Sequence, residues 1–222
     1  STGCDALLAL DLKRGAFVHG WRLIPVGDHQ REVRLKQLLL HFGRKVRITS
    51  LRVEPFDPNA PGGPPVKQQQ DFHLNNVHYQ DGRLYFSGSK LNALYCLEQD
   101  RVYAYGKTPI GTHNARPYRA GVLLNDTPRR RTAYQTRGGR VIEQFPAVLY
   151  SNEDLEWADL PEHLARPKFT RGLAVTADGL IIAGSSPATV VAYRHGRAEP
   201  IRYVTVSRDV REAVHGLEIW PF

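Results

Sequence analysis

The sequence predicts an all-β protein, a β-propeller of about four to five blades, each a four-stranded antiparallel sheet, with short helical insertions. Three segments share one pattern: a polar start, a short apolar stretch, a turn, and two further strand-like runs. They begin at His73, His113 and Arg171 and align on the turn glycines Gly82, Gly121 and Gly179. From residue 82 to residue 121 is 39 positions, and from 171 to 215 is 44. A period of roughly 40–45 residues with about four short strands is that of propeller blades.

The two ends of the chain predict parts of one further blade. Residues 1–12 align with the third strand of the unit that follows residue 73, and residues 16–24 then predict a fourth strand. Residues 214–222 predict a first strand. Joined in space, these strands would close a ring and so reduce the number of exposed edges. One strand is absent from both ends, so either the sequence is truncated or the closing blade has three strands. The sequence contains no Met, which indicates a processed, trimmed or fragmentary chain.

Residues 25–70 do not repeat, and we interpret them as an insertion on one face of the ring or as a degenerate blade. Residues 30–42 predict a helix, because Leu35, Leu38, Leu39 and Phe42 form an apolar stripe and Gly43 follows as a stop. Residues 46–56 predict a strand pair or part of an extra blade. A second insertion, residues 151–166, begins with the candidate N-cap Ser151. We treat residues 1–222 as a single propeller domain with these two insertions.

Composition restricts the possible partners. The net charge of +8 permits an anionic partner, but the charges are scattered and no basic helix appears, so a nucleic acid is not favoured. No apolar run is long enough to span a membrane. The only cysteines, Cys4 and Cys96, are expected to be buried thiols rather than a disulfide. These features fit a soluble protein, either cytoplasmic or exported.

Polar residues at the start of each first strand form the candidate site. Equivalent positions of successive blades surround the central channel of a propeller and converge on its mouth. The residues that open the four units are His73, His113, Arg171 and His215. Those close behind them are Asn75, Asn76, Asn114, Glu218 and Arg116, which Pro117 pushes toward the mouth by shortening or bulging its strand.

Three interpretations of this set remain open. Arg171, with His and Asn donors, would hold a small polar or anionic molecule. Several neutral imidazoles would instead suit a divalent metal ion, although Arg171 repels a cation; the candidate ligands are His73, His113, His215 and Glu218. In the third interpretation the side chains plug the channel and bond to the blade backbones.

No standard catalytic motif appears in the sequence. There is no GxSxG, P-loop, GxGxxG or HExxH pattern. An enzyme would therefore act through the axial site, with a histidine as general base near neutral pH. Its catalytic candidates are His113, His215 and Arg171.

The repeat HLNNVHYQDGRLYFSGSKLNALYCL, together with STGCDALLALDL and RGLAVTADGLIIAGSS, resembles NHL-like and SMP-30 (gluconolactonase)-like β-propellers, and most of all uncharacterised bacterial members. The resemblance covers about two thirds of the chain and leaves out the insertion at 25–70. It implies a lactonase-type hydrolase with a divalent cation held at the axis by Glu, Asn and Asp. Asn75 or Asn76, Asn114 and Glu218 stand at comparable places. The chain departs from that pattern at His113, Arg171 and His215, where the family has acids or amides.

Two functional hypotheses follow. The first is a small-molecule-binding propeller with its site at the axial mouth; if it is an enzyme, the resemblance makes it a lactonase-like hydrolase. The second is a non-catalytic scaffold that binds protein or carbohydrate through its top face and the helix at 30–42. An exposed apolar stripe on that helix would favour the scaffold.

Overall fold

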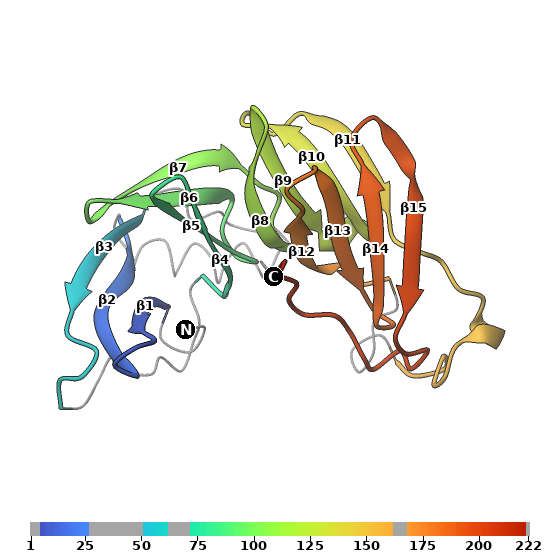
Figure 1. Cartoon of the computed structure of the whole chain (residues 1–222), viewed down its shortest axis with the longest axis horizontal. Coiled ribbons are helices and arrows are strands. Elements are labelled where there is room, and N and C mark those ends of the chain that lie inside the picture. The colour runs from blue at the N-terminus through green and yellow to red at the C-terminus, as the bar shows by residue number, and fades with distance from the viewer. Residues whose placement is uncertain (1–4, 27–50, 62–71, 162–167, 221–222) are drawn as a thin grey trace, which may run out of the picture. The chain divides into compact units, whose positions relative to one another are not determined.

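The computed structural model describes residues 5–26, 51–61, 72–161 and 168–220. The chain divides into two compact units, 1–105 and 106–222. Each unit contains two antiparallel sheets whose strands follow one another in chain order (Figure 1). Such up-and-down meanders are propeller-type blades.

The first unit contains a three-stranded sheet and a four-stranded sheet. The strands of the first sheet are β1 (Ala6–Asp11), β2 (Ala16–Pro25) and β3 (Leu51–Phe56). Those of the second are β4 (Leu74–Gln80), β5 (Arg83–Gly88), β6 (Ala93–Glu98) and β7 (Arg101–Lys107). The turn from β4 to β5 uses Asp81 and Gly82, both with positive φ, as a tight hairpin between adjacent strands requires.

The second unit contains two four-stranded sheets. The first has β8 (Thr112–Tyr118), β9 (Gly121–Asp126), β10 (Arg131–Thr136) and β11 (Val141–Pro146). The second has β12 (Arg171–Val175), β13 (Leu180–Ser185), β14 (Thr189–Arg194) and β15 (Arg197–Thr205). Two short 3-10 helices, η1 (Thr127–Arg129) and η2 (Asn152–Asp154), lie in connections.

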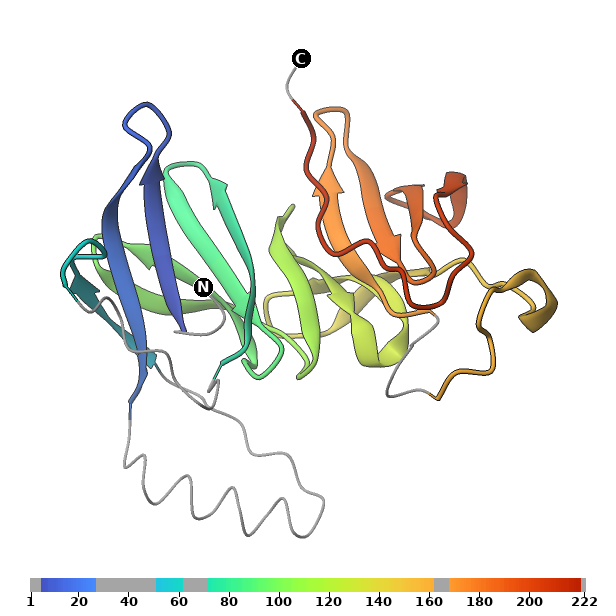
Figure 2. The same ribbon diagram turned by 90° about the horizontal axis from the view of Figure 1, so that it is seen from below.

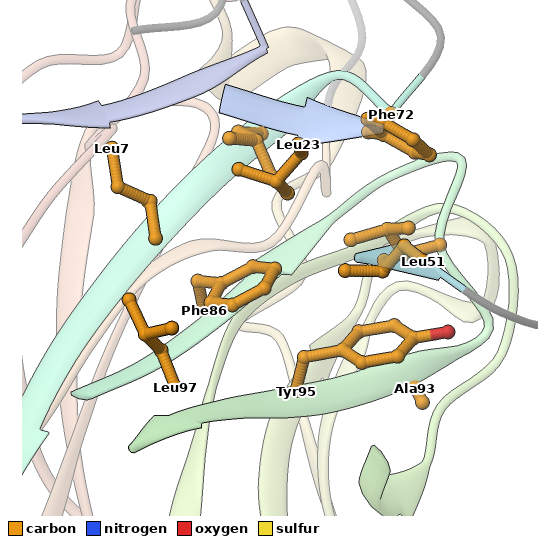
Figure 3. Close-up of a cluster of buried hydrophobic side chains, with 10 residues drawn as sticks. Leu7, Leu23, Leu51, Phe72, Phe86, Ala93, Tyr95 and Leu97 are labelled. Carbon is orange, nitrogen blue, oxygen red and sulfur yellow. The ribbon is translucent and has the colours of Figure 1, made fainter. Parts of the chain in front are cut away.

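Alternating apolar residues on the strands form one core in each unit. In the first unit Leu7, Leu23 and Leu51, one from each strand of the first sheet, pack with Phe86 and Tyr95 of the next sheet (Figure 3). In the second unit the cluster joins both sheets in the same way; it contains Leu123, Tyr134, Phe145, Leu173, Ile181, Ala183, Val191 and Tyr193. Each core therefore forms between consecutive sheets.

The predicted fold class, an all-β propeller of about four blades, is confirmed. The second and third strands of the three aligned units lie where the repeat places them, in β5–β6, β9–β10 and β13–β14. One detail of the alignment is wrong: Gly121 is the first residue of β9 rather than a turn residue with positive φ. A Cβ there would lie 2.0 Å from the Gln135 carbonyl oxygen, so this glycine permits close approach of two strands.

The structure bears on two further predictions, one for residues 46–56 and one for residues 214–222. In the predicted stretch 46–56, residues 51–56 form one strand, β3, which pairs with β2 in the first sheet, and residues 46–50 lie outside the described residues. Residues 214–220 form no strand. Val214 instead lies over Gly184, where an added Cβ would approach its Cγ1 to 2.5 Å, so the segment crosses β12 and β13 rather than extending the sheet.

The two insertions are described only in part. The predicted helix at 30–42 and its apolar stripe lie outside the described residues, as does Cys4. In the second insertion Ser151 occupies the N-cap of η2, but its hydroxyl donates to Asp154 Oδ2 (2.9 Å) rather than accepting from a backbone N–H. Cys96 on β6 is a buried free thiol. Among the described residues no helix is both long and apolar enough to cross a bilayer.

Candidate anion site

The predicted site residues are distributed over both units. The first unit holds His73, Asn75 and Asn76; the second holds His113, Asn114, Arg116, Arg171, His215 and Glu218. Within the second unit the structure brings Arg171 and His215 into direct contact and places Glu218 close enough to Arg116 to act on its charge.

The residues of the first unit shape the start of β4. His73 has a positive φ of 49°, and its carbonyl oxygen accepts a hydrogen bond from the Ser89 N–H (3.1 Å). Asn75 lies in a bulge between Leu74 and Asn76, where it accepts a hydrogen bond from the Ser87 hydroxyl (3.4 Å). These contacts fix the edge of the blade.

A buried polar network connects the two sheets of the second unit. The Asn114 side-chain oxygen accepts from the Gly172 N–H (2.7 Å). The Asn125 amide donates to the Gly172 carbonyl (3.0 Å), and its oxygen accepts from the Thr132 hydroxyl (2.7 Å). Both polar groups of the Gly172 backbone are thus satisfied by side chains from the neighbouring blade. The network holds Gly172, with its φ of +73°, beside β8.

His113 is part of the same buried interface. Its Nδ1 lies 2.9 Å from Thr127 Oγ1 and 3.1 Å from the Gly111 carbonyl oxygen. Since the Thr127 hydroxyl donates its hydrogen to the Thr170 carbonyl (2.8 Å), Nδ1 must be the donor to Thr127. His113 therefore carries a proton on Nδ1 and positions the loop that leads into β12, a structural task.

Arg171 is the first residue of β12 and is held by two neighbours. Its guanidinium lies over the Phe169 ring, 4.3 Å from the centroid, an arrangement that stabilises a cation. Its Nη1 donates to Nδ1 of the exposed His215 (2.8 Å). The planar guanidinium is thus oriented before any ligand arrives.

The electrostatics of the cluster favour an anion. Partial burial, followed by the adjacent Arg171 guanidinium, lowers the pKa of His215, so the imidazole is neutral at pH 7. Burial lowers the pKa of Arg116 on β8, while the Glu218 carboxylate acts in the opposite direction. Arg116 nevertheless stays charged at neutral pH, because an arginine side chain keeps its proton in proteins. These residues thus comprise two guanidinium groups, one imidazole and one carboxylate.

The metal interpretation finds no ligand cluster in the described part of the chain. Among residues 5–26, 51–61, 72–161 and 168–220, no group of three or more His, Cys, Asp or Glu side chains could hold a metal ion. The candidate ligands His73, His113, His215 and Glu218 therefore form no such group. A divalent cation would also be repelled by the Arg171 guanidinium.

Three important residues escaped the sequence analysis. Phe169, two residues before Arg171 at the start of β12, packs its ring against the Arg171 guanidinium. Asn125 and Thr127 complete the buried network. The only signal was the position of Asn125 and Thr127 around the end of an apolar strand. His195, which is outside the predicted set, forms a hydrogen bond through Nδ1 with Glu143 Oε2 (2.7 Å).

Comparisons with known proteins add likeness of fold alone. No family model matches the chain, and no curated protein matches it. Similar solved structures include the WD40 β-propeller domain of Doa1 (13% identity, TM-score 0.47, covering 73% of this chain and 50% of that one). Virginiamycin B lyase from Staphylococcus aureus is another (14% identity, TM-score 0.34, covering 58% of this chain and 43% of that one). The matches thus span half or less of the known chains. The NHL-like or SMP-30-like assignment stays a prediction.

Proposed function

We propose that this propeller binds a small anionic molecule, a carboxylate or a phosphate, at a site formed by Arg116, Arg171 and His215, which we call the anion site. The carrying observation is the Arg171 guanidinium, which is stacked on Phe169 and hydrogen-bonded to His215. A guanidinium held in one orientation loses little entropy when it binds an oxyanion, and its parallel N–H groups match that ligand.

We place Arg116 in the same site for two reasons: the hydrogen bond between Asn114 and Gly172 joins β8 to the start of β12, and Glu218, three residues after His215, acts on the charge of Arg116. Its partial desolvation, the cause of its lowered pKa, means that a bound anion would regain electrostatic stabilisation there. The Glu218 carboxylate provides part of that stabilisation while no ligand is bound. An incoming anion would replace it.

The proposal is a binding function rather than a lactonase reaction. Lactonases of the SMP-30 type depend on an axial cation held by acids and amides. In this chain Asn114 uses its oxygen for the Gly172 N–H, and His113 uses Nδ1 for Thr127. These side chains serve the joint between two blades, and Arg171 and His215 are the groups that we propose to meet a ligand.

The test is calorimetric titration of the whole chain with inorganic phosphate and with citrate, on wild type and Arg171→Met. Loss of one charge-assisted interaction worth about 1.5–3 kcal/mol should weaken binding about 10- to 150-fold. The matched control is Arg119→Met, which removes an exposed guanidinium from the turn after β8, where it lies 5.7 Å from the Tyr118 ring centroid. Equal binding by wild type and Arg171→Met, or no binding of either anion, would refute the proposal.

A further inference from the structure

The segment that supplies His215 differs from the blades. Residues 211–220, which we call the strap, contain no helix or strand, and they pass along β12 and β13 (Figure 2). Two contacts fix the start of the strap. The Ser186 hydroxyl donates to the Val210 carbonyl (3.0 Å), and Arg211 pairs with Asp209 (2.6 Å).

Two residues anchor the strap on the sheet: Val214, and Leu217, whose Cγ would lie 3.1 Å from a Cβ added to Gly172. The Val214 N–H donates to the Ser185 carbonyl (3.2 Å), and its side chain lies over two glycines. A Cβ on Gly184 would come within 2.5 Å of Val214 Cγ1, and one on Gly172 within 3.0 Å of the same atom. The absence of side chains at Gly172 and Gly184 therefore creates the seat for Val214.

Beyond Val214, Leu217 is half-buried and the other residues of the strap are exposed. These exposed residues are His215, Gly216, Glu218, Ile219 and Trp220, and Trp220 is 75% exposed. A segment with few buried apolar groups opens at low free-energy cost. The hydrogen bond between Arg171 and His215 connects this part of the strap directly to the anion site.

We propose that the strap closes on the bound anion, so that ligand binding and ordering of residues 214–220 are coupled. The inference rests on the proposed function. A neutral His215 accepts a hydrogen bond from the Arg171 guanidinium. When His215 gains a proton, both groups are donors and repel each other, unless an anion lies between them and accepts from both.

The coupling is reciprocal by linkage. An anion held by both Arg171 and His215 binds better to the closed strap than to the open one, so it raises the closed population. Conversely, any change that opens the strap lowers the apparent affinity by the fraction that remains closed. Val214 is the residue to change, because it anchors the strap without contacting the ligand.

Hydrogen exchange measured by mass spectrometry tests the coupling on the whole chain, with and without saturating inorganic phosphate. Phosphate should slow exchange in peptides from 214–220 by about threefold or more, since closing removes opened states. Val214→Ala should weaken phosphate binding by about fivefold, because it removes the side chain that lies over both Gly172 and Gly184. The matched control Val206→Ala, at a 71% exposed position just after β15, should bind like wild type.

Calorimetry separates the two ways of failing. If wild type binds phosphate and Arg171→Met does not, while exchange in 214–220 is unchanged and Val214→Ala binds like wild type, the strap inference is overturned and the anion site stands. If wild type gives no binding heat and no exchange difference, the anion site fails and the strap inference falls with it.

Discussion

Removing the Asn125 side chain should be among the most destabilising polar substitutions in the second unit. Asn125 is fully buried, donates to the Gly172 carbonyl (3.0 Å) and accepts from the Thr132 hydroxyl (2.7 Å). Asn125→Ala leaves both partners buried without that bond. Each of the two orphaned groups costs about 1–3 kcal/mol, so we expect a loss of about 2–6 kcal/mol in the free energy of unfolding. That is a large fraction of the 5–15 kcal/mol typical of a folded protein.

Urea denaturation followed by circular dichroism measures this loss, with Asn152→Ala in the exposed helix η2 as the matched control. A Thr132→Val background sharpens the test. There the Thr132 hydroxyl no longer exists, so the cost of Asn125→Ala should fall by about 1–3 kcal/mol. A loss under about 1 kcal/mol, or an equal loss in both backgrounds, would contradict the network argument.

Two further predictions concern backbone packing and pH. Gly121→Ala should lose about 3 kcal/mol in urea denaturation, because the new Cβ would lie 2.0 Å from the Gln135 carbonyl oxygen. Gly138→Ala, whose nearest atom would lie at 3.7 Å, should be nearly neutral, and equal losses would refute the steric reason. His215 has a lowered pKa in the folded protein, so the unfolded chain binds more protons between that pKa and about 6.5. Its contribution to stability should be complete above pH 6.5 and fall as pH falls below it, and His215→Gln should abolish this part of the dependence. Sulfate, whose charge is constant in this range, should bind wild type more tightly at lower pH, because protonated His215 adds a cation; the same slope in His215→Gln would contradict that role.

The site depends on the joint between blades. Asn114 and Asn125 hold the backbone of Gly172, and this fixes the starting point of β12 and hence of Arg171. Functional groups held by secondary contacts of this kind keep their geometry without a ligand. The same contacts explain why substitutions in the network should reduce both stability and anion binding.

Much of the fold could be predicted because blade structure is local. Apolar alternation and turn chemistry repeat along the chain, so the strands around Leu123 and Ile181 were recognisable within a few residues. The strand at 51–56 was harder, since its partner β2 precedes it by many residues. Pairing across a long connection leaves no periodic signal in the sequence.

The sequence could not distinguish the roles of the candidate site residues. His113, Arg171 and His215 occupy equivalent positions in the repeat alignment, yet His113 bonds inside the joint between blades, whereas Arg171 and His215 meet near the surface. Whether one of these side chains forms hydrogen bonds in the joint between blades depends on residues such as Asn125 and Thr127, which lie about ten or more positions away along the chain. Side-chain satisfaction is a property of the packed interface.

By itself, the sequence determined that this is an all-β propeller-type chain with polar residues gathered at the starts of strands, because hydrophobic period and turns are encoded residue by residue. Only the tertiary structure decided that residues 211–220 cross β12 and β13 as a strap and bring His215 to Arg171. The physical reason is that Val214 can occupy the space over Gly172 and Gly184 only once those strands are paired. That seat exists in no single stretch of the chain.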